Sequence, residues 1–363
     1  MGPEFKPAAV TSAAGNPPDG GKVTFERGSE VIGAETLTGG SASLTTSSLQ
    51  VGDDSIMAVY AGDPSFGGST SKAIQQMVSK ASTTTLLISS QNPSNYEQSV
   101  TFTATVSPQF AGTPTGTVKF YAGTVVLGSK ALVDGSASYS TTKLAAGTDS
   151  ITAVYEGGNS FESSTSTALS QVVGQSSTTT TLVSSASPTN YMQSVTFTAT
   201  VAGQFGGMVT GSVVFTDGAS TLNTVSLAGG VARYTTTSLA VGTHNIIATY
   251  QGSASFTGSP SAVLTQTVNQ SSTTTSLTSS LNPSTAGQSV TFTATVTGQF
   301  GGPVTGSVVF TDGATTLRIV GISGTTASYT TSALGAGTHN ITATYGGNAG
   351  FIGSSQTLTQ TVN

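Results

Sequence analysis

Histidine is the side chain best suited to acid–base catalysis and metal binding near neutral pH, and this chain contains two, His244 and His339. Both stand in the motif Gly-Thr-His-Asn-Ile, 95 residues apart, which is about one domain length. Metal binding and acid–base catalysis need several such groups at one place. Two further copies of the motif carry Asp54 and Asp149 at this position. We therefore interpret it as part of a turn or the start of a strand, and predict no catalytic residue, metal ligand or cofactor.

The acidic residues Asp53, Asp54 and Asp63 come nearest to a calcium site, because calcium binds six to eight oxygens that include carboxylates. The third and fourth copies of the same region carry Ser253 and Asn348 in place of Asp63, and those copies contain no glutamate. The sequence therefore predicts no calcium site shared by all copies. A calcium site confined to the first copy stays an open alternative.

Aromatic rings on turns can stack on sugars, and two tyrosines fit that description. Tyr96 and Tyr191 stand in equivalent Ser-Asn-Tyr and Thr-Asn-Tyr turns, and the fourth copy has Ala286 there. Rows of threonine on exposed strands offer a second sugar- or water-binding surface, but threonine is also an ordinary residue on the solvated face of a sheet. Tyr96 and Tyr191 are therefore the ligand-binding candidates of this sequence.

The elements that must position these residues are written four times. Residues Ile246, Ala248 and Tyr250 alternate with Asn245, Ile247 and Thr249, which is the two-residue period of a strand with one buried face. The leucine, tyrosine and phenylalanine of this region recur every 95 residues, at Leu49, Leu144, Leu239 and Leu334, at Tyr60, Tyr155, Tyr250 and Tyr345, and at Phe66, Phe161, Phe256 and Phe351.

The second, third and fourth copies contain further strand signals separated by turns. A threonine-rich opening strand leads to a proline turn, and the segment Ser-Val-Thr-Phe-Thr-Ala-Thr-Val then alternates apolar and polar residues. Asp217-Gly218 marks a hairpin, and Gly229-Gly230 marks a later turn. About seven strands per copy, with turns every 8–12 residues and no helical period, predict an all-β fold of tandem seven-stranded sandwiches.

The period divides the chain into repeat 1 (residues 1–79), repeat 2 (80–174), repeat 3 (175–269) and repeat 4 (270–363). The linkers, Gly-Gln-Ser-Ser and Asn-Gln-Ser-Ser, are too short for neighbours to fold back on each other. We therefore expect an end-to-end string, on the order of 150 Å long for strands of about eight residues.

Repeat 1 lacks the opening strand, and Pro-Ala-Ala-Val-Thr-Ser (7–12) is interpreted as the tail of its second strand. Residues 1–5, Met-Gly-Pro-Glu-Phe, are interpreted as an expression-tag remnant, with the native targeting signal removed. We expect repeat 1 to be less stable than the others, or to complete its sheet with tag residues or a neighbouring molecule.

Composition excludes several classes of function. Only 7% of residues are charged, the net charge is −5, and residues 175–363 carry two acids and two bases. Nucleic-acid binding needs several Lys or Arg residues on one face, which this chain lacks. No apolar run approaches the roughly 20 residues that span a bilayer. Cysteine is absent, which excludes disulfides and thiol catalysis.

The recurring pattern G-x-V-x-F, L-x-x-G-T-H-x-I-x-A-x-Y-x-G, F-x-x-S and L-x-Q-x-V resembles the bacterial immunoglobulin-like repeats of group 3. The residues that carry this resemblance in repeat 3 are Gly211, Val213, Phe215, Leu239, Gly242, Tyr250, Gly252, Phe256, Leu264, Gln266 and Val268. The resemblance implies a seven-stranded sandwich in a secreted or surface-attached bacterial protein. Tandem copies in that family act as stalks, adhesive arms or spacers, and the family has no catalytic residues to carry over.

Some surface-stalk domains of this general class carry internal covalent cross-links. Repeats 3 and 4 lack lysine, which excludes a Lys–Asn isopeptide there, and acids that would activate a Thr–Gln ester are missing. We expect the recurring last-strand glutamine to bond backbone or loop groups instead, at Gln76, Gln171, Gln266 and Gln360.

The sequence therefore predicts a non-enzymatic, extended stalk or spacer outside a bacterial cell. The alternative is an adhesin-type module that binds surface glycans or proteins. Partners would include other domains of a parent protein, and we expect neither nucleic-acid binding nor membrane insertion.

Overall fold

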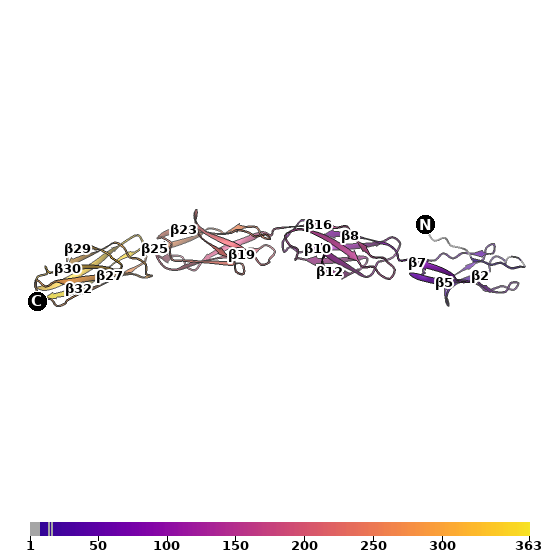
Figure 1. The fold of residues 1–363 in the computed structure, drawn as a ribbon, viewed down its shortest axis with the longest axis horizontal. Coiled ribbons are helices and arrows are strands. Elements are labelled where there is room, and N and C mark those ends of the chain that lie inside the picture. The colour runs from indigo at the N-terminus through magenta and orange to yellow at the C-terminus, as the bar shows by residue number, and fades with distance from the viewer. Residues whose placement is uncertain (1–7, 14, 16) are drawn as a thin grey trace. The chain divides into compact units, whose positions relative to one another are not determined.

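The computed structural model describes residues 8–13, 15 and 17–363, so the predicted tag residues 1–5 lie outside the described part. Every regular element there is a strand (Figure 1), and no helix is long and apolar enough to cross a membrane. The chain forms two compact units. The first comprises Met1–Ser94 and Ser99–Val173, and the second comprises Asn95–Gln98 and Gly174–Asn363.

Repeat 4 shows the architecture most simply. Its strands are β26 (Thr273–Ser279), β27 (Val290–Gly298), β28 (Ser307–Asp312), β29 (Thr315–Gly321), β30 (Thr326–Thr331), β31 (Gly337–Gly347) and β32 (Ile352–Val362). They form a three-stranded sheet of order β26-β27-β30 and a four-stranded sheet of order β29-β28-β31-β32. The predicted seven-stranded sandwich is therefore confirmed.

Repeat 3 has the same plan with two additional two-residue strands. Its strands are β17 (Thr178–Ser184), β18 (Thr189–Asn190), β19 (Val195–Gly203), β20 (Ser212–Asp217), β21 (Ser220–Ser226), β22 (Val231–Thr236), β23 (Gly242–Tyr250), β24 (Ser259–Pro260) and β25 (Leu264–Asn269). The sheets are β17-β19-β22 and β18-β25-β23-β20-β21, with β24 paired to β23. Strand β18 runs parallel to β25, whereas all other pairs of this repeat are antiparallel.

Repeat 2 repeats this topology. Its strands are β8 (Thr83–Ser89), β9 (Ser94–Asn95), β10 (Val100–Pro108), β11 (Thr117–Ala122), β12 (Val125–Ala131), β13 (Ser136–Thr141), β14 (Gly147–Tyr155), β15 (Ser164–Thr165) and β16 (Leu169–Gly174). The sheets are β13-β10-β8 and β12-β11-β14-β16-β9, with β15 paired to β14. The proline turns that follow the opening strands of repeats 2 to 4 contain cis peptide bonds, before Pro93, Pro188 and Pro283.

Repeat 1 is a partial sandwich. Its strands are β1 (Ala8–Ala9), β2 (Lys22–Arg27), β3 (Glu30–Thr36), β4 (Ser41–Ala42), β5 (Gly52–Tyr60), β6 (Ser69–Thr70) and β7 (Ile74–Val78). Strand β1 pairs with β4, and Val10 N donates to Gly40 O, as Val106 N donates to Gly135 O in repeat 2. Residues 7–12 were predicted to be the tail of the second strand, and the described residues of that segment confirm it.

The cores follow from the alternation in the sequence. In β19, Val195, Phe197, Ala199 and Val201 are buried, because their side chains all point to one face of the strand. They pack against Phe215 of the facing sheet and its neighbours in one cluster. Threonines on the opposite face pair their hydroxyls across strands, as Thr196 does with Thr235 at 2.8 Å.

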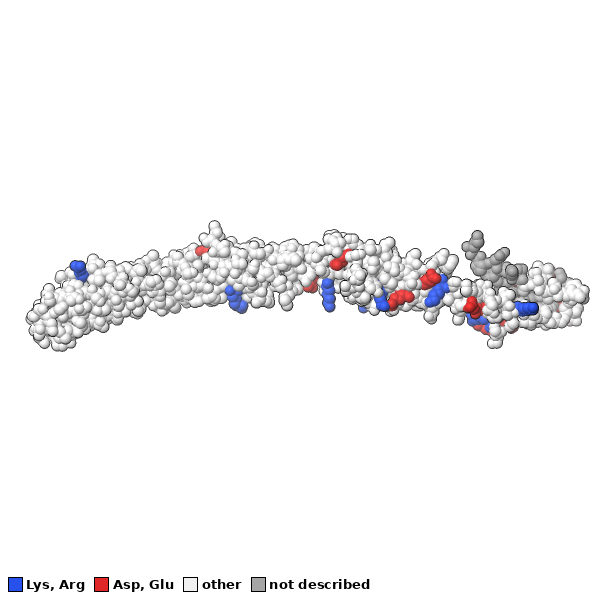
Figure 2. Space-filling model, viewed as in Figure 1, with Lys and Arg blue, Asp and Glu red and all other residues white. Residues whose placement is uncertain are grey.

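Charged side chains gather on the first unit, and the second unit presents a nearly uncharged surface (Figure 2). The hydroxyl and amide groups of Thr, Ser, Asn and Gln must therefore keep that surface hydrated.

Candidate functional site

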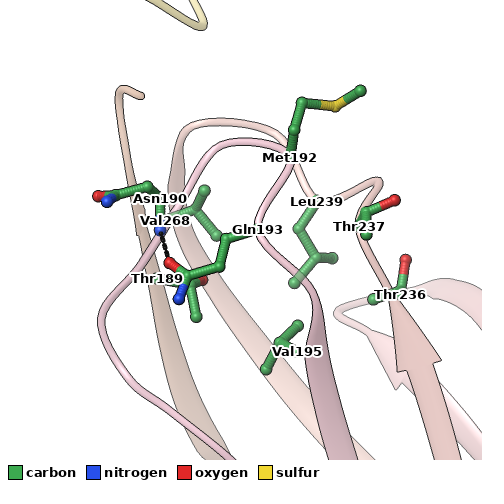
Figure 3. Close-up of a pocket in the computed structure, with 9 residues that line it drawn as sticks. All are labelled: Thr189, Asn190, Met192, Gln193, Val195, Thr236, Thr237, Leu239 and Val268. Carbon is green, nitrogen blue, oxygen red and sulfur yellow. Dashed lines mark hydrogen bonds between the residues drawn. The ribbon is translucent and has the colours of Figure 1, made fainter. Parts of the chain in front are cut away.

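Tyr191 and Met192 lie in a turn that is held in one conformation. We call residues 189–193 the tyrosine turn of repeat 3. Gln193 Oε1 accepts a hydrogen bond of 2.9 Å from Asn190 N (Figure 3), and Tyr191 N donates to Asn269 O at 2.8 Å. Met192 has a φ of 67°, a left-handed backbone conformation that residues other than glycine rarely adopt. The turn thus presents its two large side chains in a fixed direction.

The ring of Tyr191 packs edge-on against Phe351 of repeat 4. The ring centroids are 5.3 Å apart and the planes meet at 83°, an arrangement in which the positive ring edge meets the negative face. Tyr96, which belongs to the second unit, makes the same contact with Phe256 at 5.3 Å and 85°. The structure therefore places both predicted ligand-binding tyrosines in packing contacts with the following repeat.

A glycine makes room for the phenylalanine of this contact. A Cβ on Gly298, at the end of β27, would lie 2.5 Å from Cε1 of Phe351, and Gly203 holds the same place in repeat 3. Repeat 2 has Pro108 at this position, and its Phe161 is only half-buried, whereas Phe351 is 1% exposed. The glycine and the preceding tyrosine therefore occur together with a fully buried phenylalanine.

The depression beside the tyrosine turn is not a ligand cavity. It is lined by Val195, Leu239, Val268 and their neighbours (Figure 3), and has no room for a water molecule. In Figure 3 the side chain of Met192 points away from it. Met192 packs with Tyr191 against the core of repeat 4 instead.

His244 lies at the third position of β23, in agreement with its predicted place at a strand start. Its side chain is 13% exposed and bonds Asp217 of the β20–β21 hairpin, with Nδ1 to Oδ2 at 2.6 Å. His339 and Asp312 repeat this pair in repeat 4 at the same distance. No prediction was made for this pairing.

A reversed pair occupies the same two positions in repeat 1. Arg27 stands where repeat 3 has Asp217, Asp54 stands where it has His244, and Arg27 Nη1 lies 3.4 Å from Asp54 Oδ1. Repeat 2 has Ala122 opposite Asp149, whose Oδ2 is buried without a partner in the described part of the chain. In repeats 1, 3 and 4 the two positions are 27 residues apart and carry groups of opposite charge. This recurrence in the sequence could have predicted that the two side chains meet.

The pKa of both histidines is raised above the ordinary value of 6.5. Burial by itself lowers the pKa of His244, but the hydrogen bond to Ala240 O and the bond and charge of Asp217 together outweigh it. The hydrogen bond to Gly335 O is the largest cause of the raised pKa of His339, followed by the bond to Asp312. Both imidazoles are therefore held toward the protonated form.

Asp54 and Asp63, two of the three acids considered for calcium in repeat 1, have structural partners: Arg27 pairs with Asp54, and Asp63 closes a turn. Asp63 Oδ1 accepts from Ser65 N at 2.7 Å and Phe66 N at 2.9 Å, which closes the turn before the phenylalanine. Ser253 and Asn348 accept from the equivalent backbone groups of repeats 3 and 4, so all three residues serve one turn. Across residues 8–13, 15 and 17–363, no group of three His, Cys, Asp or Glu is placed to hold a metal ion.

The last-strand glutamine was predicted to bond backbone or loop groups in all four repeats, and it does. In repeat 1, Gln76 Nε2 donates to Met77 O at 3.2 Å. Gln266 is fully buried: its Oε1 accepts from Ser184 Oγ at 2.7 Å, and its Nε2 donates to Thr189 Oγ1 and Thr267 O, each at 3.1 Å. Gln171 and Gln360 make the equivalent bonds to a serine of the opening strand, a serine of the following turn and the next backbone carbonyl. In each of repeats 2 to 4 the glutamine amide therefore joins the opening strand, and the turn that follows it, to the last strand.

All four repeats match one known protein family. A family model described as bacterial Ig-like domain (group 3) matches residues 6–79, 87–174, 181–269 and 277–363. A comparison with curated proteins found no match.

Several solved structures are similar in fold. Domains 1–6 of the surface layer protein SbsC share 16% identity at a TM-score of 0.29, over 98% of this chain and 51% of that one. The Escherichia coli adhesin FdeC shares 16% identity at 0.28, over 77% of this chain and 96% of that one. A tandem from titin shares 14% identity at 0.25, over 76% and 99%. At these TM-scores none of the three carries an argument about function.

Proposed function

The chain belongs to the bacterial Ig-like domain family of group 3, and we propose that its four repeats form a non-catalytic, extended spacer within a larger secreted or cell-surface bacterial protein. The observation that supports this best is the contact of a tyrosine turn with the phenylalanine of the next repeat. Such a contact restricts the angle between neighbours without forming a binding pocket. The repeat boundaries 79/80, 174/175 and 269/270 are part of this proposal.

The linker between repeats 3 and 4, Asn269–Ser272, supports a stiff connection because each of its residues is bonded to a repeat. The bonds are Tyr191 N to Asn269 O (2.8 Å), Gln270 Nε2 to Asn348 O (2.7 Å), Ser271 N to Gly350 O (2.9 Å) and Ser272 Oγ to Gln299 Oε1 (2.7 Å). A linker whose backbone and side chains are bonded in this way has few dihedral angles left to act as a hinge. Reach, on this proposal, is set by the number of repeats.

Small-angle scattering of the full chain tests the spacer directly. We expect an extended particle with a maximum dimension on the order of 150 Å, from strands of about eight residues per repeat. Changing both Tyr96 and Tyr191 to Ala should broaden the distribution of interatomic distances, because the connections then bend more freely. A compact, folded-back particle would contradict the proposal, and so would a double variant with unchanged scattering.

A ligand-binding role is a second proposal, which specific exposed rings favour. Phe110, Phe205 and Phe300 follow strands β10, β19 and β27 at the repeat period, and they are 67%, 38% and 39% exposed. Tyr96 and Tyr191 also belong to this proposal, although each ring contacts a phenylalanine. Glycan-array binding that is lost when the three phenylalanines become Ala would support an adhesin-type module. Binding lost only when Tyr96 and Tyr191 become Ala would assign the site to the tyrosine turns. No binding to any glycan on the array would contradict the ligand-binding proposal and leave the spacer as the proposed function.

A further inference from the structure

Both ring nitrogens of His244 face atoms that can only accept hydrogen bonds. Nδ1 lies 2.6 Å from Asp217 Oδ2, and Nε2 lies 2.8 Å from the carbonyl oxygen of Ala240. His339 stands in the same way, 2.6 Å from Asp312 Oδ2 and 2.9 Å from Gly335 O. A neutral imidazole has one N–H and can satisfy one acceptor, whereas the imidazolium ion donates to two. Both bonds therefore exist together only in the protonated ring.

The partners of His244 come from two separate parts of repeat 3. Asp217 ends strand β20 at the hairpin, and its Oδ1 also accepts from Asn245 N at 3.1 Å. Ala240 lies in the loop that leads into β23. A protonated His244 thus ties the β20–β21 hairpin to this loop, and loss of the proton leaves a nitrogen lone pair facing one of the two oxygens.

Few other charges surround these histidines. Apart from Asp217 and His244, repeat 3 has one charged residue, the exposed Arg233, on β22 of the other sheet. On β25 the register partner of His244 is the neutral Gln266. Repeat 4 has the exposed Arg318 on β29, and Gln360 on β32 opposite His339. Asp217 and Asp312 are therefore the charged groups that face the two rings.

We propose that the two His–Asp pairs are proton-operated ties, which lock the hairpin to the loop in repeats 3 and 4 below a threshold pH and release that lock above it. Repeat 1 has a permanent ion pair at the same two positions, because Arg27 and Asp54 keep opposite charges throughout the neutral range, and this pair joins the hairpin to strand β5. The proposal is independent of the spacer role, since it concerns the internal stability of single repeats.

The sign of the pH dependence follows from the direction of the shift. A histidine whose pKa is raised on folding stabilises the folded state fully below the unfolded pKa of about 6.5. This contribution is lost as the pH rises through the raised folded pKa of His244 and His339. Repeats 3 and 4 should therefore lose stability on the alkaline side of 6.5, where repeat 1 keeps its Arg27–Asp54 ion pair.

Nitrogen-15 NMR of the full chain tests the proposal, because the chain has two histidines in all. At pH 6 we expect both ring nitrogens of both residues to carry protons, and each pKa to lie above 6.5. Asp217→Asn should lower the proton affinity of His244 by at least about tenfold, one pKa unit, while His339 serves as the unchanged internal control. Neutral rings at pH 6, a pKa at or below 6.5, or no response to Asp217→Asn would each overturn the proposal.

Discussion

Replacing Tyr191 with Ala should weaken repeat 4, although the changed residue lies in repeat 3. The substitution removes an edge-to-face pair, which contributes about 0.5–1.5 kcal/mol beyond its buried area. It also uncovers part of Phe351, which is 1% exposed beneath the tyrosine. With the lost apolar contact at about 25 cal/mol per Å², we expect repeat 4 to lose about 1–2 kcal/mol. That loss corresponds to a factor of about 5–30 in its unfolding equilibrium.

Hydrogen–deuterium exchange of the full chain can read each repeat separately. Peptides from β26, β27 and β31 should exchange faster by about 5–30-fold, while peptides from repeat 2 stay unchanged. Thr237→Ala is the matched control, because Thr237 is exposed at the same end of repeat 3. Exchange in repeat 4 that stays the same in Tyr191→Ala, or that changes equally in Thr237→Ala, would refute a stabilising contact between the two repeats.

Three further substitutions test the packing of single repeats. Gln266→Leu should cost repeat 3 about 1–3 kcal/mol in urea unfolding, because buried groups lose their partners; an unchanged midpoint would show that they find others. Gly298→Ala should destabilise repeat 4 by about 1–3 kcal/mol through the clash with a core ring, whereas Gly321→Ala, with no atom near its Cβ, should not. Ala122→Arg should stabilise repeat 2 by about 1 kcal/mol, because the arginine can pair with Asp149, and a lower melting temperature would contradict this pairing.

The strands and the fold class could be predicted because strand formation depends on local alternation. Val195, Phe197 and Ala199 are buried as their two-residue period requires, and the hairpin at Asp217-Gly218 forms where a residue with positive φ is needed, at Gly218. The strand patterns recur every 95 residues, so each strand assignment could be checked against the equivalent residues of the other copies. The bonding of the buried glutamines to loop groups was also predicted correctly.

The roles of particular polar and aromatic residues could not be predicted in the same way. Tyr191 and Phe351 are 160 residues apart, and their contact depends on how one repeat meets the next. In the sequence, the position of Asp63, Ser253 and Asn348 was judged only as a possible calcium ligand. The structure shows that all three side chains close one turn. Their shared capacity to accept a backbone hydrogen bond explains why three different side chains serve at this position, where repeat 2 has Gly158.

By itself the sequence determined the elements, the core faces and the number of repeats, because each depends on the order of residues within a few positions or on one repeated period. Tertiary structure alone decided which groups meet across loops, namely Tyr191 with Phe351, His244 with Asp217, and the linker with repeat 4. Such contacts depend on the directions in which separate turns point, which the side-chain alternation of strands does not encode. The two proposals on stiffness and proton binding rest on those contacts.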